Sequence, residues 1–96
     1  MTLRESIRMK REAILQVAAA HGARNVRLFG SVVRGDANAT SDVDLLVEML
    51  PGRTLLDHVG LWQDLEELLG RKVDVVSEKA LHWYVRDRVL AEAVPL

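Results

Sequence analysis

The sequence predicts a small α/β or α+β domain in which helices pack on a short mixed sheet. Three observations support this class. Apolar residues recur with helical spacing in some segments and alternate with polar residues in others. Glycine, proline and small polar residues separate those segments. The 96 residues, of which 49% are apolar, fit one domain with its own core. We therefore expect a single domain spanning residues 1–96.

The expected elements follow in the order helix, strand, helical turn, strand, helix, strand and helix. The first helix begins at a capping box in residues 2–5 and ends at Gly22. Residues 30–35 form a tight turn into about one helical turn, with Ser31 as its N-cap, and residues 36–41 form a polar loop. The other elements are strands at 25–29, 42–48 and 73–76, helices at 55–69 and 79–92, and an extended tail at 94–96 that suits an edge strand.

The same periodicity predicts which side chains face the core. That core is mostly aliphatic, because only four residues are aromatic. In the first helix the inward residues are Leu3, Ile7, Ile14, Leu15 and Ala18, and in helix 55–69 they are Leu55, Val59, Trp62, Leu65 and Leu69. The strands contribute Val26, Leu28, Val43, Leu45 and Val47, and the last helix contributes Leu81, Val85 and Val89.

Composition excludes several classes of protein. The chain has no cysteine, which excludes disulfide scaffolds, thiol catalysis and cysteine-based zinc sites. No apolar run approaches the ~18 residues that span a bilayer, so we expect a soluble, cytoplasmic protein without a membrane partner. Residues 1–35 hold seven Lys/Arg and two Asp/Glu, a net charge of +5, whereas the remainder holds six and twelve, a net charge of −6. This asymmetry suits an anionic ligand near the N-terminal part, although charged faces that simply lie in solvent are the more common explanation.

Two carboxylates stand together at the start of the second expected strand. Asp42 and Asp44 alternate with Val43, so both project from one face, with Cα atoms roughly 6.6–6.8 Å apart. Carboxylates this close repel each other, and a cation between them relieves the repulsion. Mg²⁺ fits, since it prefers carboxylate oxygens, water and substrate phosphates. Taken alone, the pair is also explained by a strand start that lies in solvent.

A third carboxylate strengthens the prediction of a site. The stretch from Asp44 to Asp74 holds the rest of one strand, a helix and the start of the next strand, which is a crossover unit. If the two strands are parallel neighbours, Asp74 enters the sheet at the same end as Asp42 and Asp44. Three carboxylates are enough to hold two metal ions and to take a proton from an incoming hydroxyl.

The turn at residues 30–35 supplies groups that suit a phosphate. Gly30 ends the first strand and lets backbone approach an anion without a Cβ in the way. Ser31 starts the helical turn, whose free N–H groups favour an anion, and Arg34 lies three residues further on the same face. A plain loop with a solvated arginine is the simpler explanation of the Gly-Ser pair by itself.

Other metal sites fit the sequence poorly. An EF-hand needs an oxygen ligand and a glycine where this chain has Leu46 and Val47. Phosphatases with an aspartate nucleophile carry Asp-x-Asp after a buried strand, whereas here the apolar run follows the pair. His21, His58 and His82 lack the spacing of zinc ligands and are expected to be ordinary surface or interface residues. Trp62, Trp83 and Tyr84 are expected in the core or in a partner contact.

Together these motifs resemble a known family. The chain carries Gly30-Ser31, then Asp42-x-Asp44 after ten intervening residues, with Arg34-Gly35 between them and Asp74 in a later apolar strand. This combination, from about residue 24 to the C-terminus, closely resembles the minimal nucleotidyltransferases of the DNA polymerase beta-like superfamily. The resemblance implies the nucleotidyltransferase fold. Val33 departs from the smaller alanine that is usual in relatives, but removes no functional group.

The resemblance also implies a role for each motif residue. Asp42, Asp44 and Asp74 would be the catalytic and Mg²⁺-binding residues, with two ions expected. Gly30, Ser31 and Arg34 would bind the triphosphate of ATP, the nucleotide substrate.

Short proteins of this type resemble the antitoxins of HEPN/MNT toxin–antitoxin pairs. The resemblance implies transfer of AMP from ATP to a tyrosine of a HEPN ribonuclease toxin, within a hetero-oligomer and without direct nucleic-acid binding. Length agrees, because a site of three carboxylates and its scaffold use all 96 residues and leave no domain to hold an acceptor. Two alternatives stay open: an antitoxin that acts by binding alone, and a nucleotidyltransferase for a small molecule such as an aminoglycoside.

Overall fold

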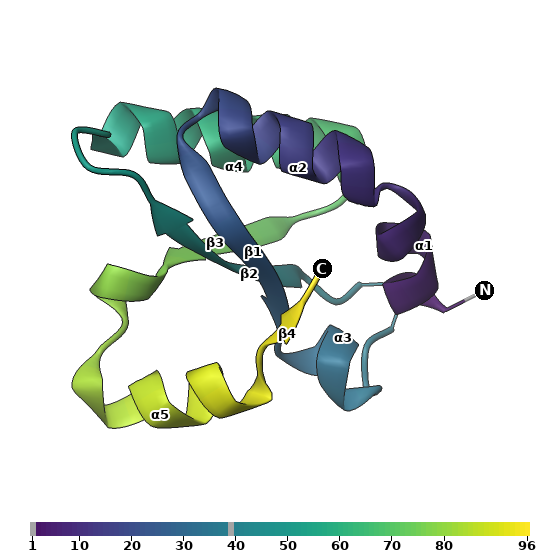
Figure 1. Ribbon diagram of the computed structural model, residues 1–96. Helices are drawn as coiled ribbons and strands as arrows, with labels where there is room; N and C mark the ends of the chain where they lie inside the picture. The colour runs from purple at the N-terminus through teal and green to yellow at the C-terminus, as the bar shows by residue number, and fades with distance from the viewer. Residues whose placement is uncertain (1, 39) are drawn as a thin grey trace.

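The computed structural model describes residues 2–38 and 40–96 and has the expected mixed architecture (Figure 1). Position 39, within the expected loop 36–41, lies outside the described residues. The elements in chain order are α1 (Leu3–Met9), α2 (Arg11–Ala20), β1 (Ala23–Phe29), α3 (Ser31–Arg34), β2 (Val43–Met49), α4 (Leu55–Leu69), β3 (Val73–Ser77), the 3-10 helix η1 (Glu78–Ala80), α5 (Trp83–Glu92) and β4 (Val94–Pro95).

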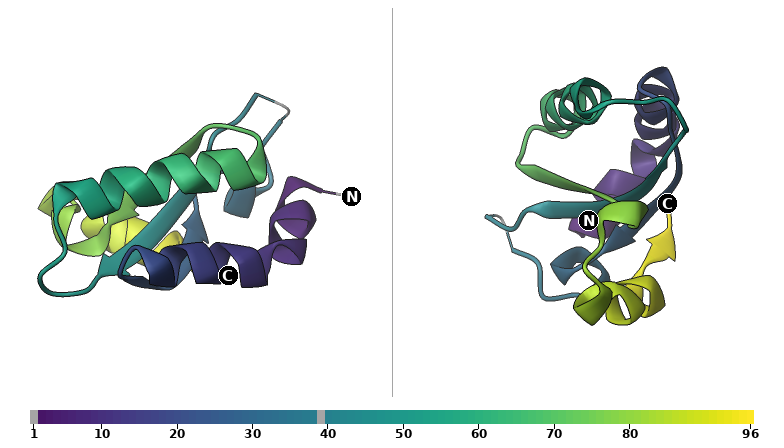
Figure 2. Two further views of the ribbon diagram at one scale, coloured as in Figure 1. Left: turned by 90° about the horizontal axis from the view of Figure 1, so that it is seen from above. Right: turned by 90° about the vertical axis from the view of Figure 1, so that its left-hand side faces the viewer.

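Four strands form one mixed sheet in the order β3-β2-β1-β4. β1 runs antiparallel to β2 and to β4, so the expected edge strand at the C-terminal end is confirmed. β2 and β3 are parallel, joined by the crossover helix α4. Helices α2 and α4 lie side by side on one face of the sheet, and α5 lies on the other (Figures 1 and 2).

The core fills the space between the sheet and the α2–α4 layer. It is aliphatic, as the sequence predicts, because the inward positions of β1, β2 and β3 are valine, leucine and alanine. The side chains below 2% exposure are Ile7, Ile14, Leu28, Val43, Leu45, Leu46, Val47, Leu61 and Leu65. No helix among residues 2–38 and 40–96 is both long and apolar enough to cross a bilayer.

The expected first helix is in fact two helices. The helix is interrupted at Lys10, which is the C-cap of α1 and the N-cap of α2 and has a φ of −100° and a ψ of 13°. The capping box at Thr2 is present, with the hydroxyl accepting from the Glu5 N–H at 3.1 Å. The break lets α1 pack against α3 while α2 packs on β1 and α4. Apolar spacing alone does not reveal it, since Ile7 and Ile14 keep helical spacing across the break.

β1 is longer than expected and contains a bulge. Asn25 has a φ of +52°, and the pairing with β2 shifts register between Arg24 and Arg27. The extra residue places Ala23 and Val26, three positions apart, on the same buried face. Because the bulge interrupts the alternation of buried and exposed residues, the sequence pattern does not predict that β1 begins at Ala23.

The bounds of α4 are as expected, but its buried face is rotated from the predicted stripe. The helix starts after Thr54, whose N–H donates to the Asp57 carboxylate at 2.9 Å, and ends at Gly70 with a φ of +67°. Leu61 and Leu65 are the buried residues, whereas Leu55 is 76% exposed and Trp62 is 41% exposed. The expectation for Leu65 is confirmed, whereas that for Leu55 and Trp62 was wrong, because Leu61 lies on the same helical line as Leu65 and faces the core in their place.

Two further local predictions are corrected. Gly30 is the N-cap of α3, and Ser31 is its first helical residue rather than its cap. The last helix is interrupted after η1, and α5 begins at Trp83; its N-cap is His82, whose side chain accepts from the Tyr84 N–H at 3.1 Å. Val89 is buried as expected.

The rotated face of α4 gives a direct test. Leu61→Ala removes a fully buried side chain, so we expect it to lower the free energy of unfolding by about 2–5 kcal/mol. Leu55→Ala, in the same helix, removes an exposed one, so we expect a change within about 0.5 kcal/mol. Urea denaturation of both variants measures this difference. Equal losses of unfolding free energy in the two variants would mean that Leu55 faces the core, as the sequence predicted.

Candidate active site

The parallel pairing of β2 with β3 brings the predicted carboxylates to one end of the sheet. Asp44 and Asp74 are direct partners in the register, and Asp42 lies just before the first residue of β2. Neighbouring strands lie about 4.8 Å apart, so Asp44 and Asp74 stand side by side. Asp42 and Asp74 are exposed, and Asp44 is half-buried.

The crowding of these carboxylates changes the ionisation of the middle one. The pKa of Asp44 is raised to about 6, first because burial disfavours the charged form and then because of the charges of Asp74 and Asp42. Arg34 opposes this shift with its positive charge. A second cation at this position would relieve the same repulsion.

Gly30 is required by the close approach of Asp44. Its φ of +75° and ψ of −151° lie in a region that only glycine adopts readily. A Cβ at this position would collide with the Asp44 carboxylate. A side chain at residue 30 would therefore force the Asp44 carboxylate out of its position. Gly30 lies this close to Asp44 because the preceding residue, Phe29, is the register partner of Asp44.

The predicted phosphate-binding residues belong to α3 and its N-cap, next to the carboxylates of β2 and β3. Ser31 is half-buried, and Arg34 is exposed at the last position of the helix. Arg34 pairs with two acidic groups, with Glu92 at 2.9 Å and with Asp36 at 3.5 Å. These contacts, the hydrogen bond to Glu92 first, raise the pKa of Arg34.

Glu92 is a residue that sequence reasoning did not place at the site. It ends α5, and its carboxylate also accepts from the Gly30 N–H at 3.2 Å. Nothing in the local pattern of residues 83–92 marks it, because helix 79–92 was expected to present only its apolar face. Only the pairing of β4 with β1, which returns the end of α5 to the α3 turn, brings it there.

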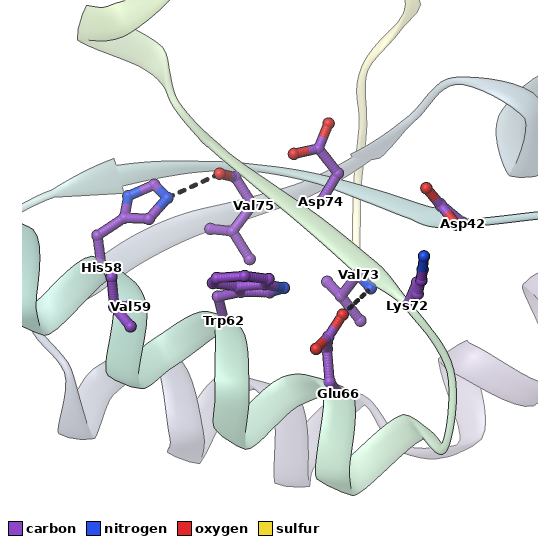
Figure 3. Close-up of a pocket in the computed structure, with 9 residues that line it drawn as sticks. All are labelled: Asp42, His58, Val59, Trp62, Glu66, Lys72, Val73, Asp74 and Val75. Atoms are coloured by element: carbon purple, nitrogen blue, oxygen red, sulfur yellow. Dashed lines mark hydrogen bonds between the residues drawn. The ribbon is translucent and has the colours of Figure 1, made fainter.

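On the other side of the carboxylates, a cavity of about 550 Å³ opens along the outer edge of β3 (Figure 3). Among the described residues its lining includes Asp42 and Asp74 but neither Gly30 nor Arg34. Figure 3 shows Asp74 pointing away from α4, while Trp62 rises from α4 beneath the strand. The carboxylates therefore stand between the α3 turn and this cavity.

Side chains of α4 satisfy backbone groups on that outer edge. Glu66 accepts from the Val73 N–H at 3.0 Å, and His58 Nε2 donates to the Val75 carbonyl at 2.8 Å (Figure 3). His21 pairs with Asp64 at 2.6 Å, and His82 caps α5. The histidines thus have structural contacts, as the sequence led us to expect, whereas Trp83 and Tyr84 are 78% exposed and do not belong to the core.

The donor set suits Mg²⁺ in chemistry. Carboxylate oxygens are its preferred protein ligands, and it commonly takes one or two of them, with water and substrate phosphates completing the shell. Within residues 2–38 and 40–96, no three acidic, histidine or cysteine side chains converge closely enough to enclose an ion by themselves. An ion here would be held by the Asp42–Asp44 pair together with groups of the substrate.

Comparison with known proteins gives the family. Residues 10–96 match the family model described as the nucleotidyltransferase domain. A relative from Methanocaldococcus jannaschii, provisionally named a protein adenylyltransferase, is 43% identical over 81 residues, which cover 84% of this chain and 87% of the relative. The protein adenylyltransferase MntA of Thermococcus cleftensis is 42% identical over 73 residues, 76% of this chain and 74% of the relative.

Solved structures agree with this match. A structure provisionally described as a minimal nucleotidyltransferase has a TM-score of 0.88 and 54% identity, covering 100% of this chain and 97% of that one. A toxin–antitoxin crystal structure with AMP-PNP has a TM-score of 0.75 and 21% identity, covering 88% and 69%, and shows likeness of fold. The protein is thus an enzyme of the nucleotidyltransferase class.

More particularly, the chain belongs to the family of nucleotidyltransferase domains, as its Gly-Ser and Asp-x-Asp motifs predict. The resemblance to the minimal members of that family is confirmed.

The raised pKa of Asp44 predicts how stability depends on pH. In EDTA, the folded protein keeps a proton on Asp44 between pH 3.8, the ordinary pKa of an aspartate, and about pH 6, whereas the unfolded chain loses it. The contribution of Asp44 to stability therefore falls as pH rises through this window and stays constant above it. Asp44→Asn removes the loss. We expect it to be more stable than wild type above about pH 6.5 by about 0.5–2 kcal/mol, with solvent screening keeping the gain modest.

Thermal melts from acid to neutral pH measure this gain. Asp87→Asn, which removes an exposed charge from α5, is the control and should change little across the range. A clear loss of stability in Asp44→Asn at neutral pH would mean that Asp44 is a structural residue.

Proposed function

We propose that this protein transfers AMP from ATP to a tyrosine of a partner HEPN-type ribonuclease toxin and acts as its antitoxin. The observation that carries the proposal is the meeting of Asp42, Asp44 and Asp74 at one end of the sheet, beside the Gly30–Arg34 turn. The name of the Thermococcus cleftensis relative and the toxin–antitoxin assembly of the structural neighbour support the class of acceptor. One domain over residues 1–96 provides the whole site.

In the proposed reaction, each part of the site has one role. Ser31, Arg34 and the Gly30 backbone bind the triphosphate, and Asp42 and Asp44 face the α-phosphate. Mg²⁺, with two ions expected, would be held by Asp42 and Asp44 together with the phosphates, with Asp74 completing the site, and would neutralise charge on the phosphates. The acceptor enters from the β3 side, opposite the α3 turn, which suits an in-line displacement.

The transfer forms one bond to phosphorus and breaks another. The tyrosine oxygen attacks the α-phosphorus and forms a phosphodiester, and the bond from that phosphorus to the oxygen bridging to the β-phosphate breaks. Pyrophosphate leaves, and Asp74 takes the proton of the tyrosine hydroxyl. The site lies in an open position at a sheet end, which admits a protein loop as acceptor. We therefore expect the isolated protein to bind ATP but to turn it over negligibly.

Intact-mass spectrometry tests the proposal. The partner should be a small helical protein with an Arg-x4-His motif encoded beside this chain, and with ATP and Mg²⁺ it should gain AMP on tyrosine. We expect Asp42→Asn and Asp74→Asn to slow this transfer about a hundred- to ten-thousand-fold, as loss of a catalytic group does. Asp87→Asn is the matched control and should transfer AMP at the wild-type rate.

Other outcomes decide between the alternatives. Neutralisation of the toxin without any gain of mass would mean that the antitoxin acts by binding alone. A mass gain on an added aminoglycoside, and not on the partner, would mean that the acceptor is a small molecule.

A further inference from the structure

Glu92 makes two contacts with the α3 turn that tie the end of α5 to the site. One carboxylate oxygen accepts from the Gly30 N–H at 3.2 Å, and the other accepts from Arg34 Nη1 at 2.9 Å. The side chain is 23% exposed, whereas that of Arg34 is 54% exposed. Glu92 thus places an anion between a backbone donor and a guanidinium.

These two donors are the ones that the proposed function gives to the triphosphate. Carboxylate and phosphate oxygens accept the same hydrogen bonds, and an arginine engaged with one cannot fully serve the other. We propose that Glu92 occupies the phosphate-binding groups of the nucleotide-free protein and that ATP binding must displace it. This inference rests on the proposed function and adds a competing contact within the site.

The surrounding charges also support a competition that lowers the affinity for ATP. Glu92 lies close enough to Asp44 for its charge to act on that carboxylate. It therefore adds a negative charge to a site that already holds three. Asp36 also pairs with Arg34, at 3.5 Å. An incoming triphosphate meets an arginine already neutralised and a carboxylate that repels it, and both effects lower its affinity.

The contact also has a role when no nucleotide is bound. Glu92 ends α5, and the next element, β4, pairs with β1. α5 lies apart from the α2–α4 layer on the opposite face of the sheet (Figure 2). The two bonds of Glu92 hold the end of α5 against the turn, so removing them should lower the stability of the nucleotide-free protein while raising its affinity for nucleotide. A purely structural residue would lower both.

Calorimetric titration with α,β-methylene-ATP and Mg²⁺ tests the inference, since this analogue cannot release pyrophosphate. For Glu92→Gln we expect binding about two- to tenfold tighter than wild type, as release of a partly exposed ion pair and its repulsion would give. The melting temperature without nucleotide should fall. Asp87→Asn, which removes the same charge elsewhere on α5, should change neither quantity.

Arg34→Ala separates this inference from the proposed function. If Arg34→Ala weakens binding but Glu92→Gln leaves it equal or weaker, the proposed site stands and the competing role of Glu92 is overturned. If Arg34→Ala binds as wild type does, Arg34 is not on the triphosphate, and both its binding role and the competing role of Glu92 are overturned, while the proposed AMP transfer is judged by the mass measurement. Should Glu92→Gln not fold, Glu92→Asp keeps the charge but cannot reach both donors. Tighter binding by that variant supports the inference, and equal or weaker binding overturns it.

Discussion

Electrostatic repulsion among three carboxylates at one sheet end is the constraint on which this structure depends. Asp44 and Asp74 stand side by side because β2 and β3 are parallel and in register, and Asp42 precedes Asp44 by two residues. Parallel neighbours require a crossover, which α4 provides by packing Leu61 and Leu65 into the core. Burial of these apolar side chains of the crossover helix therefore holds the three carboxylates together against their mutual repulsion.

The position of Asp44 also determines the shape of the turn after β1. Asp44 comes so close to residue 30 that only glycine fits there. That glycine exposes a backbone N–H, and Arg34 follows one helical turn later, so cationic and polar donors stand beside the carboxylates. The Glu92 carboxylate accepts from both the Gly30 N–H and Arg34. The site therefore combines an excess of negative charge on the strands with a turn whose donors at Gly30 and Arg34 contact a carboxylate of the same chain.

The sequence predicts the part of the site that depends on alternation and element order. Asp42 and Asp44 share a face in any strand, and a helix between two strands makes parallel pairing with Asp74 the natural arrangement. The sequence also places Gly30 at the end of one expected strand and Asp42 at the start of the next, on either side of the 36–41 loop. These inferences needed only local periodicity and the order of elements.

The features that sequence reasoning missed depend on contacts between distant segments. The break at Lys10 follows from α1 packing on α3, and the bulge at Asn25 follows from the register with β2. Leu61 rather than Leu55 faces the core because two apolar stripes compete on α4 and the sheet selects one. Glu92 reaches the site only through the return of β4 to the sheet. No short stretch of sequence contains this information.

The ionisation of Asp44 tests the central claim most directly, by carbon-13 NMR of the aspartate carboxyl groups during a pH titration in EDTA. The Asp44 carboxyl should titrate at about 6, and its pKa should fall towards the ordinary range in Asp74→Asn, because one of the repelling charges is gone. Addition of Mg²⁺ with α,β-methylene-ATP should also lower it, since bound cations favour the carboxylate. An Asp44 that titrates near the ordinary value of 3.8 in EDTA and does not respond to Asp74→Asn or to Mg²⁺ would contradict the account.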